Sequence, residues 1–554
     1  MTALAALLLP LLLATGLAGP ARLREAVMRV APWAPLALAL ALPLHAGDAA
    51  RLEGPLLGVS LSVDAVSRPV LLLTMIGWTL VGWFAAARVG ERRRWFWAGW
   101  LGALAGMQLL LLAGDIASFY VGYATLGVSA YLLVTHAASA EAWRAGRVYL
   151  VMALAGEALL LVGLLLIAGS LGNAPFAELL AQPAVLADSP ARWLLFAGFA
   201  VKLGILPLHL WLPLAHPVAP VPASAILSGI IVKAGLMGWL RFVPALSDDP
   251  AWVAQALLVL GLATAFGGVA LGLTQLRLKT VLAYSTISQM GLVLAGFALA
   301  FVLPGGREVL LATLGLLALH HGLNKASLFV ACGCAPGASR LRLALFALPA
   351  LSLAAAPLTT GFVAKGALKD ALALGDGLAP GALLPAMGLL LALSSTATAL
   401  LMWKAFALAR QQADRAVPLH PAWPLLVVAG LVVPWVYGAL HGLAAVPGVA
   451  KLADATWPLL LAAALILVHR SWMRGRGPVW PEGDLVVLLE RLPWPRPRGA
   501  PPAPEDAASP PALAGLRRWL LRIERTQRRM PAMGLALLVV GTVLWVVSRW
   551  AGSS

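Results

Sequence analysis

The chain has 554 residues, of which 61% are hydrophobic and only 11% are charged, and its formal net charge is +17. Soluble domains contain roughly 45–50% apolar and about 25% charged residues, so this composition excludes a water-soluble globule and an intrinsically disordered chain. The two cysteines allow at most one bridge, which excludes a disulfide scaffold.

Apolar stretches long enough to cross a bilayer recur along the chain. A membrane helix needs about 20 mainly apolar residues, and we predict sixteen such spans from the sequence. They lie near residues 2–18, 31–46, 68–87, 95–113, 117–135, 148–170, 192–212, 219–241, 251–273, 281–302, 309–332, 344–374, 380–408, 422–443, 456–470 and 532–548. The predicted fold is an all-α, polytopic membrane protein with about 16 transmembrane helices.

Arginine and lysine are distributed differently in this chain. Arginines cluster in polar connections, for example in residues 88–94, 144–147 and 340–342, whereas most lysines lie inside apolar stretches. Because short cytoplasmic connections are enriched in basic residues, we expect the Arg-rich connections inside the cell and both termini outside. The expected location is the bacterial inner (plasma) membrane.

Residues 471–531 are rich in Pro, Arg and Trp and are too polar to span a membrane. Within them, residues 513–530 combine an apolar face with many arginines, a pattern that predicts a basic amphipathic helix. We expect this cytoplasmic segment to lie on anionic lipid, and not to bind nucleic acid.

Ionisable side chains recur inside predicted spans six to thirteen. Such groups are costly in hydrocarbon and usually face a pathway or pair with one another. They are Glu157, Lys202, Lys233, His320, His321, Lys325, Lys365 and Lys404. Because histidine, and lysine when it is desolvated, can exchange a proton near neutral pH, the series predicts a proton relay. His320 lies one residue off the stripe of His321 and is expected to face packing or lipid.

Two of the predicted spans should be broken. Lys202 precedes Pro207 and Pro213, and Lys365 follows a segment that contains prolines, each of which removes a backbone donor. Broken helices at membrane depth are tolerated where they line a polar cavity, as in many transporters. Two such breaks, each with a lysine, predict two halves built as inverted repeats.

Five motifs carry a resemblance to a known family. They are residues 196–220, 224–235, 278–291, 321–329 and 357–365. Together they resemble the antiporter-like proton-conducting membrane subunits of respiratory complex I, of Mrp cation/proton antiporters and of membrane-bound hydrogenases. The resemblance extends from about residue 63 to residue 410.

The resemblance implies a role for individual residues. Lys202 matches the central lysine of the first broken helix, Lys233 the lysine of the next helix, and Lys365 the distal Lys or Glu of the second broken helix. His321 and Lys325, four residues apart on one helical face, match the histidine and lysine of the second half. Further candidates for the proton pathway are His209, His216 and Lys404. For Lys404, a role as a structural anchor is equally well supported.

The chain departs from the family at two positions. Ala124 stands where the family has a Glu that pairs with the central lysine, and Arg277 stands where it often has an Asp. Our hypothesis is that Glu157 replaces the missing partner of Lys202. The alternative is that the first half has lost coupling.

The predicted function is proton translocation within a complex I-like, hydrogenase-like or Mrp-type assembly. The alternatives are a Na⁺/H⁺ antiporter subunit, and a subunit that supplies proton flux to a soluble partner in inorganic-carbon uptake. No catalytic site, metal or cofactor is expected: Cys332 and Cys334 lack further ligands nearby, and no phosphate-binding or flavin motif occurs. The expected partners are other integral membrane subunits, protons or Na⁺, anionic lipid and a soluble cytoplasmic subunit.

The predicted organisation has six parts. They are the N-terminal membrane helices (1–113), the first antiporter-like half (114–245), the second half (246–410), the C-terminal membrane helices (411–470), the cytoplasmic basic segment (471–531) and a terminal membrane helix (532–554).

Overall fold

A computed structural model describes the greater part of the chain. The described residues are 2–43, 50–52, 59–182, 184–187, 189–244, 249–301, 307–373, 383–444, 448–472, 480–481 and 486–487. The chain divides into two compact units, Met1–Ala50 with Ser60–Asp484, and Arg51–Val59 with Leu485–Ser554. All helices described below belong to the first unit. Two three-residue strands also occur, β1 (Ala50–Leu52) and β2 (Val59–Leu61).

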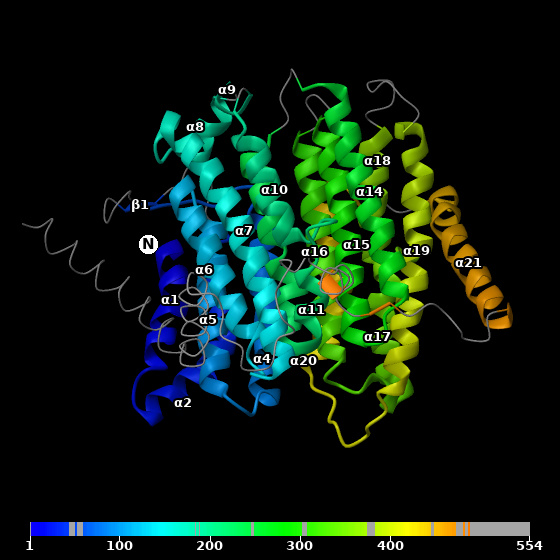
Figure 1. The fold of residues 1–554 in the computed structure, drawn as a ribbon. Helices are drawn as coiled ribbons and strands as arrows, with labels where there is room; N and C mark the ends of the chain where they lie inside the picture. Colours follow the sequence, from blue (N-terminus) through cyan, green and yellow to red (C-terminus); the bar gives the residue numbers. More distant parts are fainter. Residues whose placement is uncertain are drawn as a thin grey trace, which may run out of the picture. The chain divides into compact units, whose positions relative to one another are not determined.

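The N-terminal helices run back and forth in Figure 1. In chain order they are α1 (Thr2–Gly16), α2 (Ala21–Val30), the 3₁₀ helix η1 (Ala31–Leu40), α3 (Arg68–Leu73), the π turn η2 (Thr74–Trp78), α4 (Thr79–Arg88), α5 (Arg93–Leu112) and α6 (Ile116–Val134). α3, η2 and α4 form one apolar span from Arg68 to Arg88.

The middle of the chain contains the first broken helix. Its elements are α7 (Ala140–Leu171), α8 (Phe176–Ala181), α9 (Ala184–Ala187), α10 (Ala191–Leu203), α11 (Trp211–Val218), α12 (Val221–Ile226), the π turn η3 (Leu227–Ile231) and α13 (Lys233–Phe242). Between α10 and α11 the chain leaves the helix, as the prolines predict.

The rest of the unit contains the second broken helix. Its elements are α14 (Ala251–Leu273), α15 (Leu278–Ala298), η4 (Leu299–Phe301), α16 (Arg307–Ala331), η5 (Pro336–Ala338), α17 (Arg340–Leu353), α18 (Thr360–Ala373), α19 (Leu383–Gln411), α20 (Ala422–Leu440) and α21 (Val449–Trp472). α17 and α18 divide the predicted span 344–374. The predicted pair of breaks is therefore present.

Ten helices in the described residues are long and apolar enough to cross a membrane. The chain is thus an all-α, multi-pass membrane protein, as predicted, whereas the count of sixteen spans is not confirmed. The predicted span 31–46 contains η1, a 3₁₀ helix of ten residues with Pro35 inside it. The predicted amphipathic helix 513–530 and the last span lie outside the described residues, and the six-part organisation stays a prediction.

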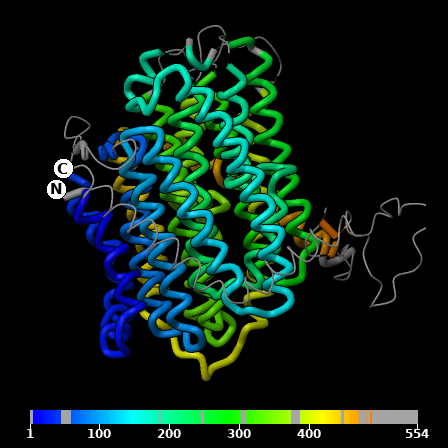
Figure 2. The backbone as a smooth tube through the Cα atoms, turned by 60° about the vertical axis from the view of Figure 1, so that its left-hand side comes forward, coloured from blue at the N-terminus to red at the C-terminus, as the bar shows by residue number. Residues whose placement is uncertain are grey.

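Burial separates central from peripheral helices. The span Leu278–Phe301 is 100% buried and Val221–Phe242 is 94% buried, whereas only 28% of α7 and 11% of the span Val449–His469 are buried. α12, α13 and α15 therefore form the centre of the unit, while α7 and α21 lie at its surface (Figures 1 and 2).

Glycines allow neighbouring helices to approach closely. A Cβ atom at Gly106 would lie 2.5 Å from the backbone nitrogen of Leu126, and one at Gly122 would lie 2.5 Å from that of Leu110. No side chain fits at either position, so the backbones of α5 and α6 touch. Small residues at such crossings are the usual means by which membrane helices pack.

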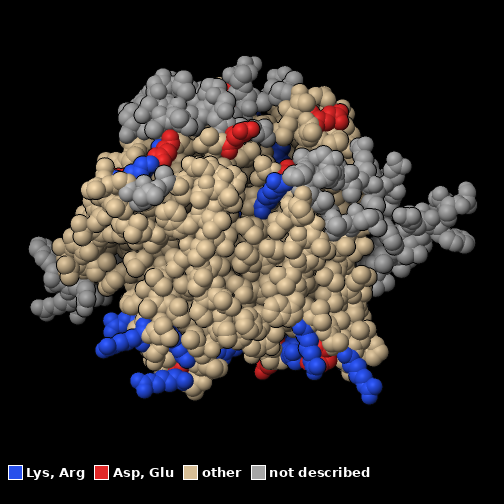
Figure 3. Space-filling view, turned by 180° about the vertical axis from the view of Figure 1, so that it is seen from behind, with Lys and Arg blue, Asp and Glu red and all other residues tan. Residues whose placement is uncertain are grey.

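The basic connections gather at one end of the unit. Arg88 donates to the carbonyl of Pro418, Arg92 to that of His136, and Arg277 pairs with Glu141 at 2.5 Å. Figure 3 shows this end as a blue lower edge, separated from the opposite end by a wide uncharged band. The charge bias that the sequence predicts is therefore present in space.

Ion pairs connect helices at the end of the unit opposite the basic connections. Arg192 pairs with Asp249, and the Arg241 guanidinium lies 2.9 Å from Asp64, which precedes α3. Burial, the largest single effect, favours the neutral acid, but the attraction of Arg241 together with hydrogen bonds from Arg241 and Ser67 outweighs it and lowers the pKa of Asp64 below its usual value. These pairs tie α10 and α13 to distant parts of the chain.

Candidate functional site

The break between α10 and α11 is built by Gly204. Its φ of +71° caps α10 in the left-handed conformation, and its N–H closes the helix on the carbonyls of Ala200 and Val201. The Val201 carbonyl also accepts a 2.8 Å hydrogen bond from the indole of Trp211, the first residue of α11. This bond fixes the two half-helices against each other, directly beside Lys202.

Lys202 points into the interior at this break and is only 5% exposed. Its Nζ lies 4.9 Å from the ring centroid of Tyr123, a cation–π contact. A cavity of about 10 Å³, lined in part by Tyr149 and Trp211, adjoins the amine. This volume is about the smallest that can hold a water molecule.

Glu157 reaches the same place from the surface helix α7. A Cβ atom at Gly127 of α6 would lie 2.5 Å from Glu157 Oε1 and 3.5 Å from Lys202 Nζ. The missing side chain of Gly127 therefore makes room for the carboxylate beside the amine. Gly127 is three residues after Ala124, close to one helical turn, so Glu157 lies near the position from which the expected carboxylate is missing.

A π turn presents Lys233. In an α-helix the Val232 N–H would bond to the carbonyl of Ser228, but here it bonds to Leu227 at 3.3 Å. The carbonyl of Ser228 instead accepts a 3.1 Å hydrogen bond from Lys233 Nζ. The local geometry of η3 thus provides an acceptor for a lysine that is only 1% exposed.

Lys233 contacts His321 across the helix interface. The distance from Lys233 Nζ to His321 Nδ1 is 2.6 Å, a hydrogen bond between two fully buried side chains. Two glycines make the approach possible: a Cβ atom at Gly229 would lie 2.8 Å from the carbonyl of Gly322, and one at Gly322 would lie 2.7 Å from that of Gly229. Within the described part of the chain, His321 Nε2 has no hydrogen-bond partner.

Hydroxyl groups connect this pair to Lys325. Ser228 Oγ lies 2.6 Å from Thr286 Oγ1, which donates to the carbonyl of Leu282 at 3.2 Å. The same carbonyl accepts a 2.8 Å hydrogen bond from Lys325 Nζ. Lys233 and Lys325 therefore share the neighbours Ser228, Thr286 and the Leu282 carbonyl, and none of these contacts involves a carboxylate. Because the two carbonyls only accept hydrogen bonds, a proton would need water to pass between the amines.

The second break surrounds His320. Its Nδ1 lies 3.0 Å from Thr360 Oγ1, at the start of α18, and Thr360 in turn contacts Ser352 Oγ at 2.8 Å. Asn324 donates to the carbonyl of His320 at 2.7 Å. The expectation that His320 faces packing or lipid is therefore wrong in part, because the ring is buried in a polar cluster that bridges α17 and α18.

Lys365 lies on α18, beyond this cluster. Its Nζ donates to the hydroxyls of Ser394 and Ser395 on α19 at 3.1 and 2.9 Å, and the side chain is 6% exposed. These serines, Thr360 and Asn324 are not among the site residues predicted from the sequence. A signal was available: Ser394, Ser395, Thr396 and Thr398 form a run of hydroxyls inside an otherwise apolar span.

The remaining candidates have other neighbours. His216 is buried and stacks on Phe329 at 4.7 Å, and His209 is buried in the connection between α10 and α11, 6.3 Å from the ring of Tyr284. Lys404 Nζ donates to the carbonyl of Leu273 at 2.8 Å, which caps the end of α14. This geometry matches the structural reading of Lys404.

The predicted residues thus form two groups. Glu157 meets Lys202 at the first break, and Lys233, His321 and Lys325 meet at the centre, with His320 and Lys365 following at the second break. In the described residues, no hydrogen bond or ion pair is found between Lys202 and Lys233. A proton passing between the two groups would need water.

Comparison with known proteins identifies the region that holds the site. Residues 113–374 match the family described as "NADH:quinone oxidoreductase/Mrp antiporter, TM". This segment is similar to the members of that family. The antiporter-like segment contains all the residues of both groups, from Glu157 to Lys365, and the predicted resemblance is confirmed.

Curated relatives agree with this assignment. Hydrogenase-4 component B of Escherichia coli is 34% identical over 241 residues, which cover 42% of this chain and 36% of the relative. An NAD(P)H-quinone oxidoreductase chain 4 of Picosynechococcus is 33% identical over 290 residues, which cover 50% of this chain and 51% of the relative. The chain therefore spans between about a third and a half of the length of these relatives.

Two solved structures share the fold. The Mrp complex from Dietzia sp. superposes with a TM-score of 0.72 at 22% identity, covering 100% of this chain and 63% of the other. An archaeal respiratory membrane complex, the membrane-bound sulfane sulfur reductase, gives 0.68 at 20% identity, covering 84% of this chain and 99% of the other. At this identity the likeness concerns the architecture alone.

The geometry of the first break leads to a test. In Gly204→Ala, the left-handed conformation alone costs about 1–2 kcal/mol, and the new methyl group collides with Leu212. We expect a clear fall in the thermal unfolding temperature of the purified protein. Gly169→Ala in α7 is the control, because a Cβ atom there meets nothing within 4 Å. Equal unfolding temperatures for the two variants would contradict the role of Gly204.

Proposed function

We propose that this chain is a proton-translocating membrane subunit of a larger assembly of the complex I, hydrogenase or Mrp type. The observation that carries the proposal is the 2.6 Å contact between Lys233 Nζ and His321 Nδ1, inside a row of buried amines. Ionisable groups buried among membrane helices usually mark a pathway. The names of the relatives, which denote components of hydrogenase and quinone oxidoreductase complexes, point to the same class.

The chemistry of the contact suits proton transfer. A neutral imidazole can accept a proton from Lys233 at Nδ1 and release one from Nε2 on the other side of the ring. Because Nε2 has no hydrogen-bond partner in the described residues, it can hand its proton to water. Lys325, Lys365 and Lys202 would then act as neighbouring stations that exchange protons through hydroxyls and water.

Such a subunit needs an external source of energy. Moving one charge against 100 mV takes about 2.3 kcal/mol, and this chain is proposed to obtain it from other integral membrane subunits of the same assembly. With the Arg-rich end in the cytoplasm, as the positive-inside rule requires, we place the protein in a bacterial inner membrane. The end that carries the Asp64–Arg241 pair then faces outward.

Proton flux into liposomes tests this proposal. The flux is driven by an imposed potential and read with a pH-sensitive dye. We expect Lys233→Met to lower it by about tenfold or more, which corresponds to a rise of about 1.4 kcal/mol in the barrier to proton transfer. Lys404→Met is the matched control and should stay close to the unsubstituted protein, because Lys404 caps α14 outside the row. Equal flux in the two variants would refute a role for the Lys233–His321 pair.

Glu157 is proposed to replace the carboxylate that is missing at Ala124. Glu157→Gln keeps the size of the side chain and removes its charge, so we expect the same assay to show flux reduced toward that of Lys202→Ala. Adding Ala124→Glu to Glu157→Gln should restore most of the flux, because it puts the carboxylate back near Lys202. Full flux in Glu157→Gln, with none in Lys202→Ala, would disprove the replacement.

A further inference from the structure

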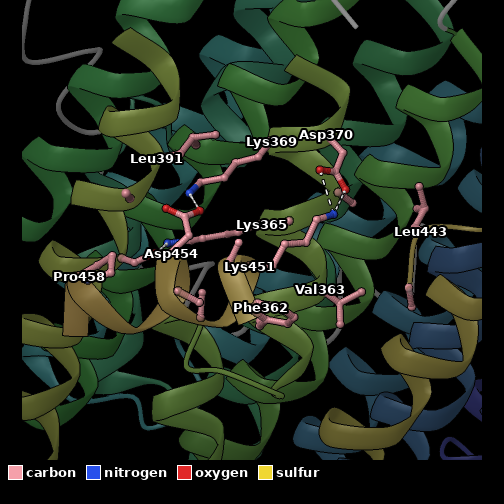
Figure 4. Close-up of a pocket in the computed structure, with 18 of the residues that line it drawn as sticks. Phe362, Val363, Lys365, Lys369, Asp370, Leu391, Leu443, Lys451, Asp454 and Pro458 are labelled. Atoms are coloured by element: carbon pink, nitrogen blue, oxygen red, sulfur yellow. Dashed lines mark hydrogen bonds and ion pairs between the residues drawn. The ribbon is translucent and has the colours of Figure 1, made fainter. Parts of the chain in front are cut away.

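A cavity of about 410 Å³ lies next to Lys365. Its walls come from α18, α19, residues 442–444, Gly448 and the beginning of α21, and Lys365 lies among the lining residues (Figure 4). Ser395, which accepts a hydrogen bond from Lys365, also lines the cavity. A space of this size holds several water molecules. It adjoins the last amine of the buried row, at the end of the unit opposite the Arg-rich connections.

Two crossed ion pairs join α18 and α21 at the wall of the cavity. Lys369 Nζ of α18 lies 2.5 Å from Asp454 Oδ2 of α21, and Lys451 Nζ of α21 lies 2.9 Å from Asp370 Oδ2 of α18 (Figure 4). Each helix thus contributes one lysine and one aspartate. These side chains are between 27% and 60% exposed. Exposed pairs are weak and are screened by salt, so these contacts can break at little cost.

The beginning of α21 is suited to move. Most of residues 449–457 are exposed or half-buried, in keeping with a helix of which only 11% is buried. Pro458 cannot donate to the carbonyl of Asp454, which interrupts the helical hydrogen bonds at this point. The carbonyl of Pro458 accepts a 2.8 Å hydrogen bond from Thr396 of α19. The helix is therefore anchored at the position where it is weakest.

We propose that residues 449–457 form a hinged lid over Lys365, latched to α18 by the Lys369–Asp454 and Lys451–Asp370 pairs. When the lid opens, water in the cavity exchanges freely with water at the outer face, and the Lys365 ammonium can release its proton to it. When the lid is latched, this exchange is slower, and Lys365 keeps its hydrogen bonds to the hydroxyls of Ser394 and Ser395. The consequence for protons rests on the proposed function, whereas the movement of the lid does not.

Thiol labelling of the full chain in lipid nanodiscs tests the lid. Cys332 and Cys334 are first replaced by serine, and a reporter Ser395→Cys is placed beside Lys365. We then measure its rate of reaction with a small membrane-impermeant thiol reagent. Lys451→Asp places two aspartates next to each other and should raise the labelling rate of Ser395→Cys about fivefold or more. Adding Asp370→Lys restores opposite charges and should return this rate to within about twofold of that of the latched protein, as in a double-mutant cycle.

A second reporter controls for general loosening. The reporter is Ser129→Cys on α6, because Ser129 is 8% exposed, close to the 6% of Ser395, and lies far from the lid in the chain. Its labelling rate should not respond to Lys451→Asp. An unchanged rate at Ser395→Cys, a failure of Asp370→Lys to reverse the change, or an equal acceleration at both reporters would overturn the lid.

The labelling readout does not depend on transport. If labelling behaves as expected in a chain that conducts no protons, the lid stands and the proposed function fails. If flux depends on Lys233 but labelling ignores the latch, the proposed function stands and the lid fails.

Discussion

An ammonium group held among membrane helices has to find oxygen or nitrogen acceptors, because hydrocarbon offers none. This requirement explains the irregular parts of the fold. The π turn at η3 leaves a backbone carbonyl for Lys233, α15 provides the carbonyl of Leu282 to Lys325, and α19 provides two serine hydroxyls to Lys365. The partners of these three amines are neutral, so each amine can lose its proton without leaving a carboxylate unpaired. Lys202 differs, because Glu157 lies beside it.

Close packing of the central helices makes these contacts possible. The glycines at 229 and 322 bring α12–α13 against α16 at the level where Lys233 meets His321, and Gly127 opens the space that Glu157 fills. The peripheral helices α7 and α21 contribute charged side chains. α7 and α21 are largely exposed, yet each carries charged side chains toward the row, Glu157 at one end and Lys451 with Asp454 at the other.

Much of this arrangement could be predicted from the sequence. Apolar length predicted most spans, and Pro207 and Pro357 lie in the two breaks that they predicted, because a missing N–H weakens a helix. Other prolines, such as Pro349 in α17, lie inside helices that continue past them. The family motifs predicted that Lys233 and His321 both belong to the proton pathway. The direct contact between them could not be predicted, because a π turn leaves no periodic signal and shifts every later side chain on its helix.

Other features depend on tertiary contacts that local patterns do not encode. His320 was expected in packing or lipid because it is one residue away from His321, but Thr360 from the second break supplies a partner for its ring. The crossed pairs between α18 and α21 join residues more than eighty positions apart. Neither could be found without the positions of the neighbouring helices.

The central claim is that one wet path joins the Lys202 group to the Lys233 group. The most direct measurement is a cryo-electron microscopy map of the protein in a lipid nanodisc, at a resolution that shows ordered water. We expect water molecules between Lys202 and Lys233 and beside His321 Nε2. A gap filled by apolar side chains, with no water between the two lysines, would contradict a continuous proton path.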